Sequence, residues 1–219
     1  MKLKKIASLM LAGIMAVSML AGCKSASDNG NGGASSSEPT TSSAFTDSVL
    51  NKTKESTRLV FAADSNDKLD KAVALAAKNH VQDQSTSRQE KLTVVTKNWE
   101  YQTLADSVMK ASDVDYAGNG SSDHLANLLN DNVADKNDKT VYTMYTVSRA
   151  MDDEWIAGEV AKLLDEWATI LDEDTATGTY DYSVRVAIAD SLTGKEADRS
   201  KDTVVIGIAV TCDFTSVNY

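Results

Sequence analysis

Two stretches near the C-terminus have a large apolar residue at every second position. The apolar positions of the first stretch, residues 178–189, are Tyr180, Tyr182, Val184, Val186 and Ile188. Those of the second stretch, residues 203–214, are Val204, Ile206, Ile208, Val210, Cys212 and Phe214. Because the side chains of a strand point alternately to its two faces, each stretch predicts a β-strand with one apolar face. Many charges and the pair Thr193-Gly194 separate the two stretches, which predicts an antiparallel hairpin with a long loop.

Apolar residues at spacings of three and four predict helices in five parts of the chain. These are residues 45–55, 65–82, 99–111, 121–133 and 152–171. The last is the clearest, and three acidic residues stand at its start, where the helix dipole favours negative charge. Its apolar positions are Trp155, Ile156, Val160, Leu163, Leu164, Trp167 and Leu171. We expect it to be the main helix packed on the sheet. Residues 57–62 either extend the first helix or form a short strand.

Two further stretches, residues 91–97 and 140–149, are rich in β-branched residues and predict strands. The order of elements then predicts an α+β fold, with a mostly antiparallel sheet of about four strands and helices packed on one face. The one-sided alternation of the last two strands predicts that the other sheet face is wet or covered by a partner. Residues 45–219 contain no proline and no second linker, so we expect a single α+β globular domain there.

The first 23 residues have a different composition from the rest of the chain. Three lysines lie within residues 1–5, an apolar run covers residues 6–20, and Leu20-Ala21-Gly22-Cys23 ends it. This pattern resembles the signal peptide and lipobox of bacterial lipoproteins. The resemblance implies cleavage after residues 1–22 and a diacylglycerol on the Cys23 sulfur, usually with an acyl group on the new amino terminus. Two or more acyl chains attach a protein stably to a membrane.

An ordinary signal peptide and an uncleaved transmembrane helix are the alternatives for this segment. The apolar run is 15 residues long, whereas a spanning helix needs roughly 20. The resemblance to lipoproteins therefore predicts a protein that is anchored to the cell membrane by a lipid on Cys23. We expect this protein to face the extracytoplasmic side.

Residues 24–44 are rich in Ser, Gly, Asn and Thr, and contain the chain's one proline, Pro39. Such a segment buries too little apolar surface to offset the entropy of ordering it. We expect residues 23–44 to form a lipidated cysteine followed by a flexible tether. A Gly-rich coil of this length spans on the order of 25 Å.

The chain is acidic, and its negative charge disfavours anionic partners. Its formal charge is −10, and loss of residues 1–22 with their three lysines takes it to −13. Nucleic acid and anionic lipid head groups should repel such a protein. With Cys23 assigned to the lipid, Cys212 is left alone, so no disulfide forms within the mature chain. Cys212 lies on the apolar face of the last predicted strand, which favours a packing role.

The residue types that carry chemistry form no recognisable catalytic pattern. The two histidines, His80 and His124, lie in predicted helices, and no serine stands in a G-x-S-x-G elbow. Residues 113–118 and 172–177 resemble calcium loops loosely, but neither supplies the six to eight oxygen ligands that calcium takes. We therefore expect no metal and no cofactor.

Taken together, the sequence favours a non-catalytic module that binds a protein, a peptide or a cell-wall component. Its candidate contact surfaces are the second sheet face, with Arg185, Thr203 and Thr211, and the loop of residues 192–202. The alternative is an extracytoplasmic enzyme, a hydrolase whose site residues are scattered along the chain. A two-lobed solute receptor is disfavoured, because the mature chain is short for two lobes around a ligand, and a one-domain receptor stays an open alternative.

Overall fold

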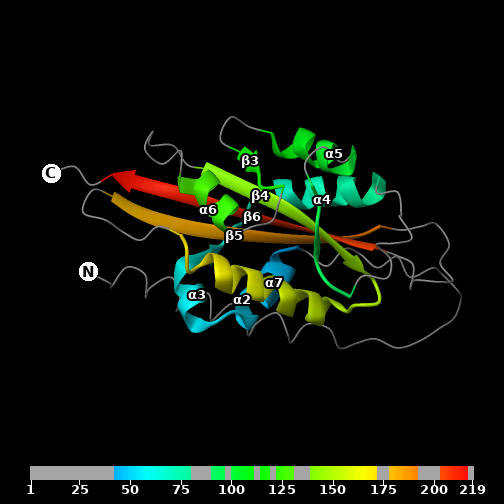
Figure 1. The fold of residues 1–219 in the computed structure, drawn as a ribbon, viewed down its shortest axis with the longest axis horizontal. Helices are drawn as coiled ribbons and strands as arrows, with labels where there is room; N and C mark the ends of the chain where they lie inside the picture. The colour runs from blue at the N-terminus through cyan, green and yellow to red at the C-terminus, as the bar shows by residue number, and fades with distance from the viewer. Residues whose placement is uncertain are drawn as a thin grey trace, which may run out of the picture. The chain divides into compact units, whose positions relative to one another are not determined.

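A computed structural model shows how the predicted elements are assembled. It describes residues 42–79, 90–96, 100–110, 114–118, 122–130, 139–171, 178–191 and 203–216, all of which belong to one compact unit, residues 39–219. These parts form a central sheet with helices on both of its faces (Figure 1).

The predicted hairpin is the centre of the sheet. β5 (Gly178–Ser191) and β6 (Thr203–Ser216) pair antiparallel along their whole length, from Gly178 opposite Ser216 to Ser191 opposite Thr203. β4 (Lys139–Ser148) pairs antiparallel with the other edge of β6. The strands predicted at residues 140–149, 178–189 and 203–214 are therefore confirmed.

Three short strands complete the sheet at its edges. β1 (Phe61–Ala63) lies parallel to β5, while β2 (Thr93–Val94) and β3 (Val114–Tyr116) share the outer edge of β4. The α+β class is confirmed, but the described residues form a mixed sheet of six strands, so the number of about four is wrong. The strand predicted at residues 91–97 is present as the two-residue β2, and β1 begins where the sequence left a short strand open. β3 was not predicted, because three residues are too few to show an alternating pattern.

Residues 57–62 contain both of the structures that the sequence left open. α3 (Glu55–Val60) ends where β1 begins. The start of α3 is held by Asp165, a residue of another helix, whose carboxylate accepts hydrogen bonds from the Lys54 backbone N–H at 2.9 Å and the Thr57 hydroxyl at 2.6 Å. This carboxylate takes the role of a cap, since Lys54 makes no capping bond with its own side chain.

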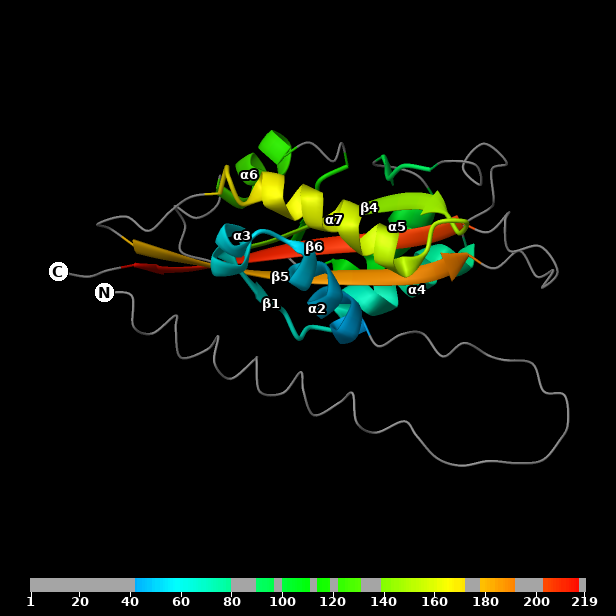
Figure 2. The same ribbon diagram turned by 90° about the horizontal axis from the view of Figure 1, so that it is seen from below.

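The first face of the sheet is covered by α7 (Asp153–Trp167), α2 (Ser42–Lys52) and α6 (Ser122–Asn130) (Figure 2). Asp152 caps α7 by accepting a hydrogen bond from the Trp155 N–H at 2.7 Å. The even-numbered apolar positions of the hairpin pack against these helices; the fully buried ones are Val184, Val186, Val204, Ile206, Ile208 and Val210. The helix predicted at residues 152–171 is confirmed as α7, and its apolar side is buried in the core on this face.

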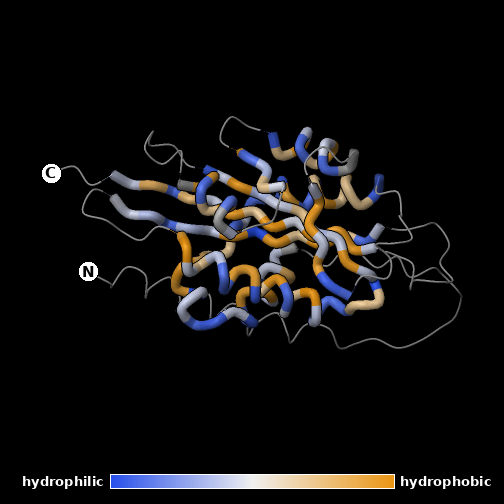
Figure 3. Tube along the Cα trace, viewed as in Figure 1, coloured by the Kyte–Doolittle hydropathy of each residue, from blue (hydrophilic) through white to orange (hydrophobic). Residues whose placement is uncertain are grey.

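The second face is covered by α4 (Lys68–Asn79) and α5 (Glu100–Met109), so the predictions of helices on one face and of a wet second face are wrong. Several positions of β5, β6 and α4 on this face are small. The buried small residues here are Ala72, Ala76, Ala77, Ala187 and Ala209. Small residues allow the helix to lie close to the sheet. Figure 3 shows apolar positions along the strands between the two helical layers.

The α2 helix also closes part of the outer edge of β5. The Thr46 hydroxyl donates a hydrogen bond to the Val186 carbonyl at 3.1 Å and accepts one from the Val186 N–H at 3.0 Å. Both backbone groups of an edge residue are thereby satisfied by one buried side chain. None of the helices among the described residues is long and apolar enough to span a membrane.

A buried tyrosine of β4 makes the folded state less stable at alkaline pH. Burial raises the pKa of Tyr145 from its ordinary value of 10.0 to about 12, with a smaller contribution from the negative charge of Glu166. A raised pKa means that the folded state holds the phenolic proton more tightly than the unfolded state. Stability from this group is therefore complete below pH ~10 and is lost as the pH rises toward ~12.

We predict a loss of about 1.4 kcal/mol from Tyr145 by roughly pH 11, relative to neutral pH. Urea unfolding at a series of pH values measures it. The Tyr145→Phe variant, which cannot ionise, should lose less stability over the same interval. Parallel losses in the variant and the wild type would contradict the assignment to Tyr145.

Candidate functional site

A small pocket opens on the second face of the sheet, at the start of α4 and the end of α5. Its cavity volume is about 120 Å³. The strand positions in its wall are Val114, Thr140, Arg185, Ala209 and Thr211, which come from four neighbouring strands. The loop between β1 and α4 and the first turn of α4 complete it with Asp64, Asn66, Lys68 and Leu69.

The loop from β1 to α4 is shaped by its own polar side chains. The Asp64 N–H donates to the Val184 carbonyl at 2.8 Å and so ends the parallel pairing with β5. The Asp64 carboxylate accepts from the Asn66 N–H at 2.9 Å, and the Asn66 amide oxygen accepts from the Lys68 N–H at 3.0 Å. Asp and Asn favour such local turns because their short side chains reach the backbone two residues ahead. The turns direct the chain from the sheet edge into α4.

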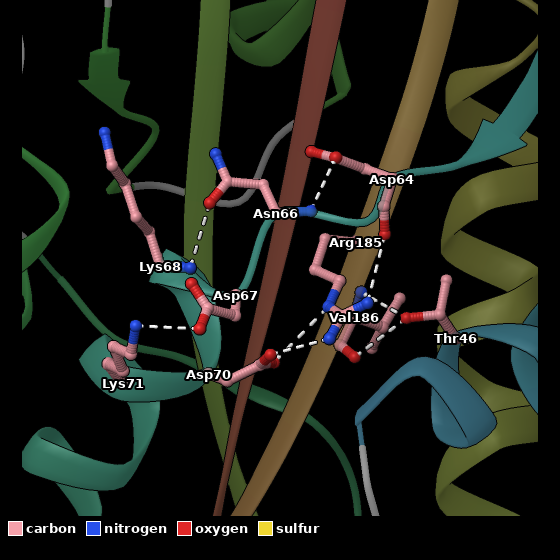
Figure 4. A network of polar contacts seen from close by, with 9 residues as sticks. All are labelled: Thr46, Asp64, Asn66, Asp67, Lys68, Asp70, Lys71, Arg185 and Val186. Atoms are coloured by element: carbon pink, nitrogen blue, oxygen red, sulfur yellow. Dashed lines mark hydrogen bonds and ion pairs between the residues drawn. The ribbon is translucent and has the colours of Figure 1, made fainter.

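A buried ion pair joins α4 to β5 below this loop (Figure 4). The Arg185 side chain, 7 % exposed, donates to the two Asp70 carboxylate oxygens at 2.6 and 3.4 Å. It also donates to the Asp64 backbone carbonyl at 3.1 Å. These bonds hold the guanidinium in one orientation against the wall of the pocket. Asp70 offsets its charge.

Asp67, just before α4, and Lys71, in its first turn, form an exposed ion pair at 2.7 Å. The hydrogen bond from Lys71 and its positive charge hold the pKa of the Asp67 carboxyl below its ordinary value. Lys68, between them, is exposed and makes no ion pair with any described residue. Lys68 therefore brings to the pocket a positive charge that no carboxylate in the described part of the chain pairs with.

The opposite wall of the pocket carries two hydroxyl groups. The Thr140 and Thr211 hydroxyls lie 2.9 Å apart across β4 and β6, and either can be the donor. Leu69, Met109 and Ala209 add apolar surface to the lining. The pocket thus combines charged, hydroxyl and apolar groups in a volume far below the several hundred Å³ of typical drug-sized sites. It suits a very small ligand.

The three residues that the sequence proposed as a contact surface lie in different surroundings. Arg185 is buried and is a wall of the pocket, and half-buried Thr211 is also part of the pocket lining. Thr203 is fully buried, in register between Ser148 and Ser191, and contributes nothing to an exposed surface. The prediction of a broad contact surface on this face is wrong, because α4 and α5 cover it. The loop of residues 192–202 lies outside the described residues.

Other sequence candidates are also located. Cys212 is 1 % exposed on the apolar face of β6, which agrees with the packing role. His124 lies in α6, while Cys23, His80 and residues 172–177 are outside the described residues. Of the other loose calcium loop, Asp115 is described, and its carboxylate pairs with buried Lys139 at 2.5 Å. The described residues contain no group of three or more His, Cys, Asp or Glu side chains placed to hold a metal ion.

Sequence reasoning did not identify the contributions of Asn66, Lys68 and Thr140 to the pocket. The run Asp64-Ser-Asn66 was a usable signal for tight turns, because two such side chains spaced by two residues favour them. No local signal marks Thr140, whose place in the pocket depends on pairing with Thr211 71 residues away.

Fold and site together define an α+β domain with a mixed sheet between two helical layers and a small polar pocket at the start of α4. No known protein family, curated protein or solved structure matches the chain.

Proposed function

We propose that this protein is a membrane-anchored lipoprotein on the extracytoplasmic face of the cell membrane that acts as a non-catalytic binding module. The observation that carries the anchoring part is the sequence Leu20-Ala21-Gly22-Cys23 behind a basic and then apolar leader. The resemblance to the lipobox assigns a covalent lipid to Cys23. Residues 24–44 then form the tether to the domain.

The pocket supports the binding part of the proposal. Its buried charged group, Arg185, is already held by Asp70 and by the Asp64 carbonyl, so the wall needs little reorganisation when a ligand enters. A wall that is already held in place and whose charge is paired is suited to binding a ligand. The partner on this proposal is a peptide, a protein or a cell-wall component, and the enzyme alternative stays a prediction.

The anchor is tested by replacing Cys23 with serine. We expect this variant to lose labelled palmitate and to leave the envelope fraction, because the sulfur that bears the lipid is gone. Cell fractionation with metabolic labelling measures both effects. Cys212→Ala is the matched control: it removes the other cysteine, which is buried, and should keep both label and location. A Cys23→Ser chain that stays in the envelope, or an unlabelled wild type, would contradict the anchor.

The binding role is tested with the full chain, solubilised from membranes and immobilised. Soluble peptide fragments of the cell wall should be retained and recovered unchanged. Shortened fragments in the eluate would favour the hydrolase, and passage of every fragment without retention would count against a wall-binding module.

A further inference from the structure

The pocket lining contains two charged side chains, Lys68 and Asp64, that form no ion pair with a described residue. Arg185 is neutralised by Asp70, and Lys71 by Asp67. The Lys68 ammonium and the Asp64 carboxylate make no ion pair with a described residue, and both line the pocket. In Figure 4 the side chains of Asp64, Asn66 and Lys68 extend to one side of the loop, away from the Arg185–Asp70 pair. The pocket therefore offers one charge of each sign.

The remaining lining groups refine the kind of ligand that fits. Whichever hydroxyl of the Thr140–Thr211 pair donates to the other, the second keeps its own O–H for a ligand. Leu69 and Met109 present an apolar surface beside these hydroxyls. The cavity volume of about 120 Å³ is somewhat below the roughly 150 Å³ of an engineered protein cavity that binds benzene. A ligand must be small, carry both charges and have at most a short aliphatic group.

We propose that this pocket binds a small zwitterion of the aliphatic amino acid class, with glycine or alanine as the size limit. Lys68 and the free threonine O–H take the ligand carboxylate, and Asp64 takes the ammonium group. Leu69 and Met109 contact the methyl group of alanine. This inference goes beyond the proposed function, because a free amino acid is smaller than the peptide, protein or cell-wall partner proposed there.

A single-charge ligand is the closest competitor. Acetate pairs with the Lys68 charge but gives the Asp64 carboxylate no ion-pair partner, and methylamine does the opposite. Both should bind more weakly than alanine. Larger amino acids such as leucine and phenylalanine should be excluded by volume.

The test is titration calorimetry on the full chain in detergent with glycine, alanine, acetate, methylamine and leucine. We expect alanine to bind, and Lys68→Met and Asp64→Asn each to weaken its binding about fivefold, as for a partly exposed charge pair. Asparagine at position 64 keeps an oxygen for the Asn66 N–H, so the loop turn is preserved. Lys71→Met is the matched control, because it removes a lysine of the same helix turn that does not line the pocket, and it should bind alanine as the wild type does.

Three results would overturn the inference: no heat with alanine, equal affinity for acetate and alanine, or alanine affinity unchanged in both pocket variants. If wall peptides are retained by the immobilised chain while alanine does not bind, the ligand class is wrong and the binding function stands. If alanine binds and no wall fragment is retained, the wall-binding function fails and the zwitterion pocket stands.

Discussion

Replacing Asp70 by alanine is expected to lower the free energy of unfolding by about 3 kcal/mol, because it leaves the Arg185 guanidinium buried without its carboxylate. The two side chains are 7 % and 24 % exposed, so water cannot fully replace the lost partner. The partial exposure of Asp70 places the effect at the lower end of the range for broken buried pairs. Urea denaturation followed by circular dichroism measures the change.

Two controls separate the buried pair from general effects on α4. Asp67→Ala removes a carboxylate from an exposed pair one turn earlier and should leave stability nearly unchanged, since solvent screens that pair. The double variant Asp70→Leu, Arg185→Met removes both charges and should recover most of the loss, because no uncompensated charge stays buried. A double variant less stable than Asp70→Ala would refute this explanation.

Replacing Gly207 by valine is expected to destabilise the protein by about 3 kcal/mol, near the upper end for overpacked cores. Gly207 lies in the middle of β6, beneath α4. A Cβ atom there would come within 3.0 Å of Leu69 Cδ1 and closer still to Val73 Cγ2. Valine favours strands, so a loss of stability would be due to the displaced helix rather than to strand propensity.

Gly158 of α7 is the matched control for this glycine. A Cβ at Gly158 meets nothing within 4 Å, and the helical backbone accepts alanine. Gly158→Ala should therefore stabilise the protein by about 0.5–1 kcal/mol, the opposite sign to Gly207→Val. Thermal unfolding of the two variants beside the wild type tests the pair. A Gly207→Val protein as stable as the wild type would show that α4 does not pack closely on the sheet.

Both experiments address the helix that forms the pocket. α4 carries Lys68 and Leu69 into the lining and Asp70 to Arg185, so its distance from the sheet sets the shape of the cavity. Displacement of α4 by Gly207→Val should also weaken any ligand binding at the pocket.

The elements with long internal patterns were predictable from sequence. β5 and β6 have fourteen residues each, and α7 has fifteen, long enough for periods of two and 3.6 to repeat several times. β1 and β3 have three residues each and no period to detect. They exist because β5 and β4 offer unpaired backbone groups at their edges, which is information from outside the short segments.

The candidate site was predictable only in fragments. Arg185 and Thr211 were marked as polar positions on the second face, but their surroundings were wrong, because the sequence does not say which helix covers that face. The partner of Arg185, Asp70, is 115 residues away in the chain. The sequence analysis did not single out Lys68, because a lysine in an amphipathic helix carries no signal of its own.

The sequence by itself determined the α+β class, the long hairpin, the main packing helix and the buried place of Cys212, and it alone supports the prediction of a lipid on Cys23. Only the tertiary structure decided that α4 lies on the second face, that Arg185 meets Asp70, and that a small pocket forms beside them. The physical reason is range: periodicity acts within one element, whereas the choice of face and the pairing of charges depend on the fit between elements far apart in the chain.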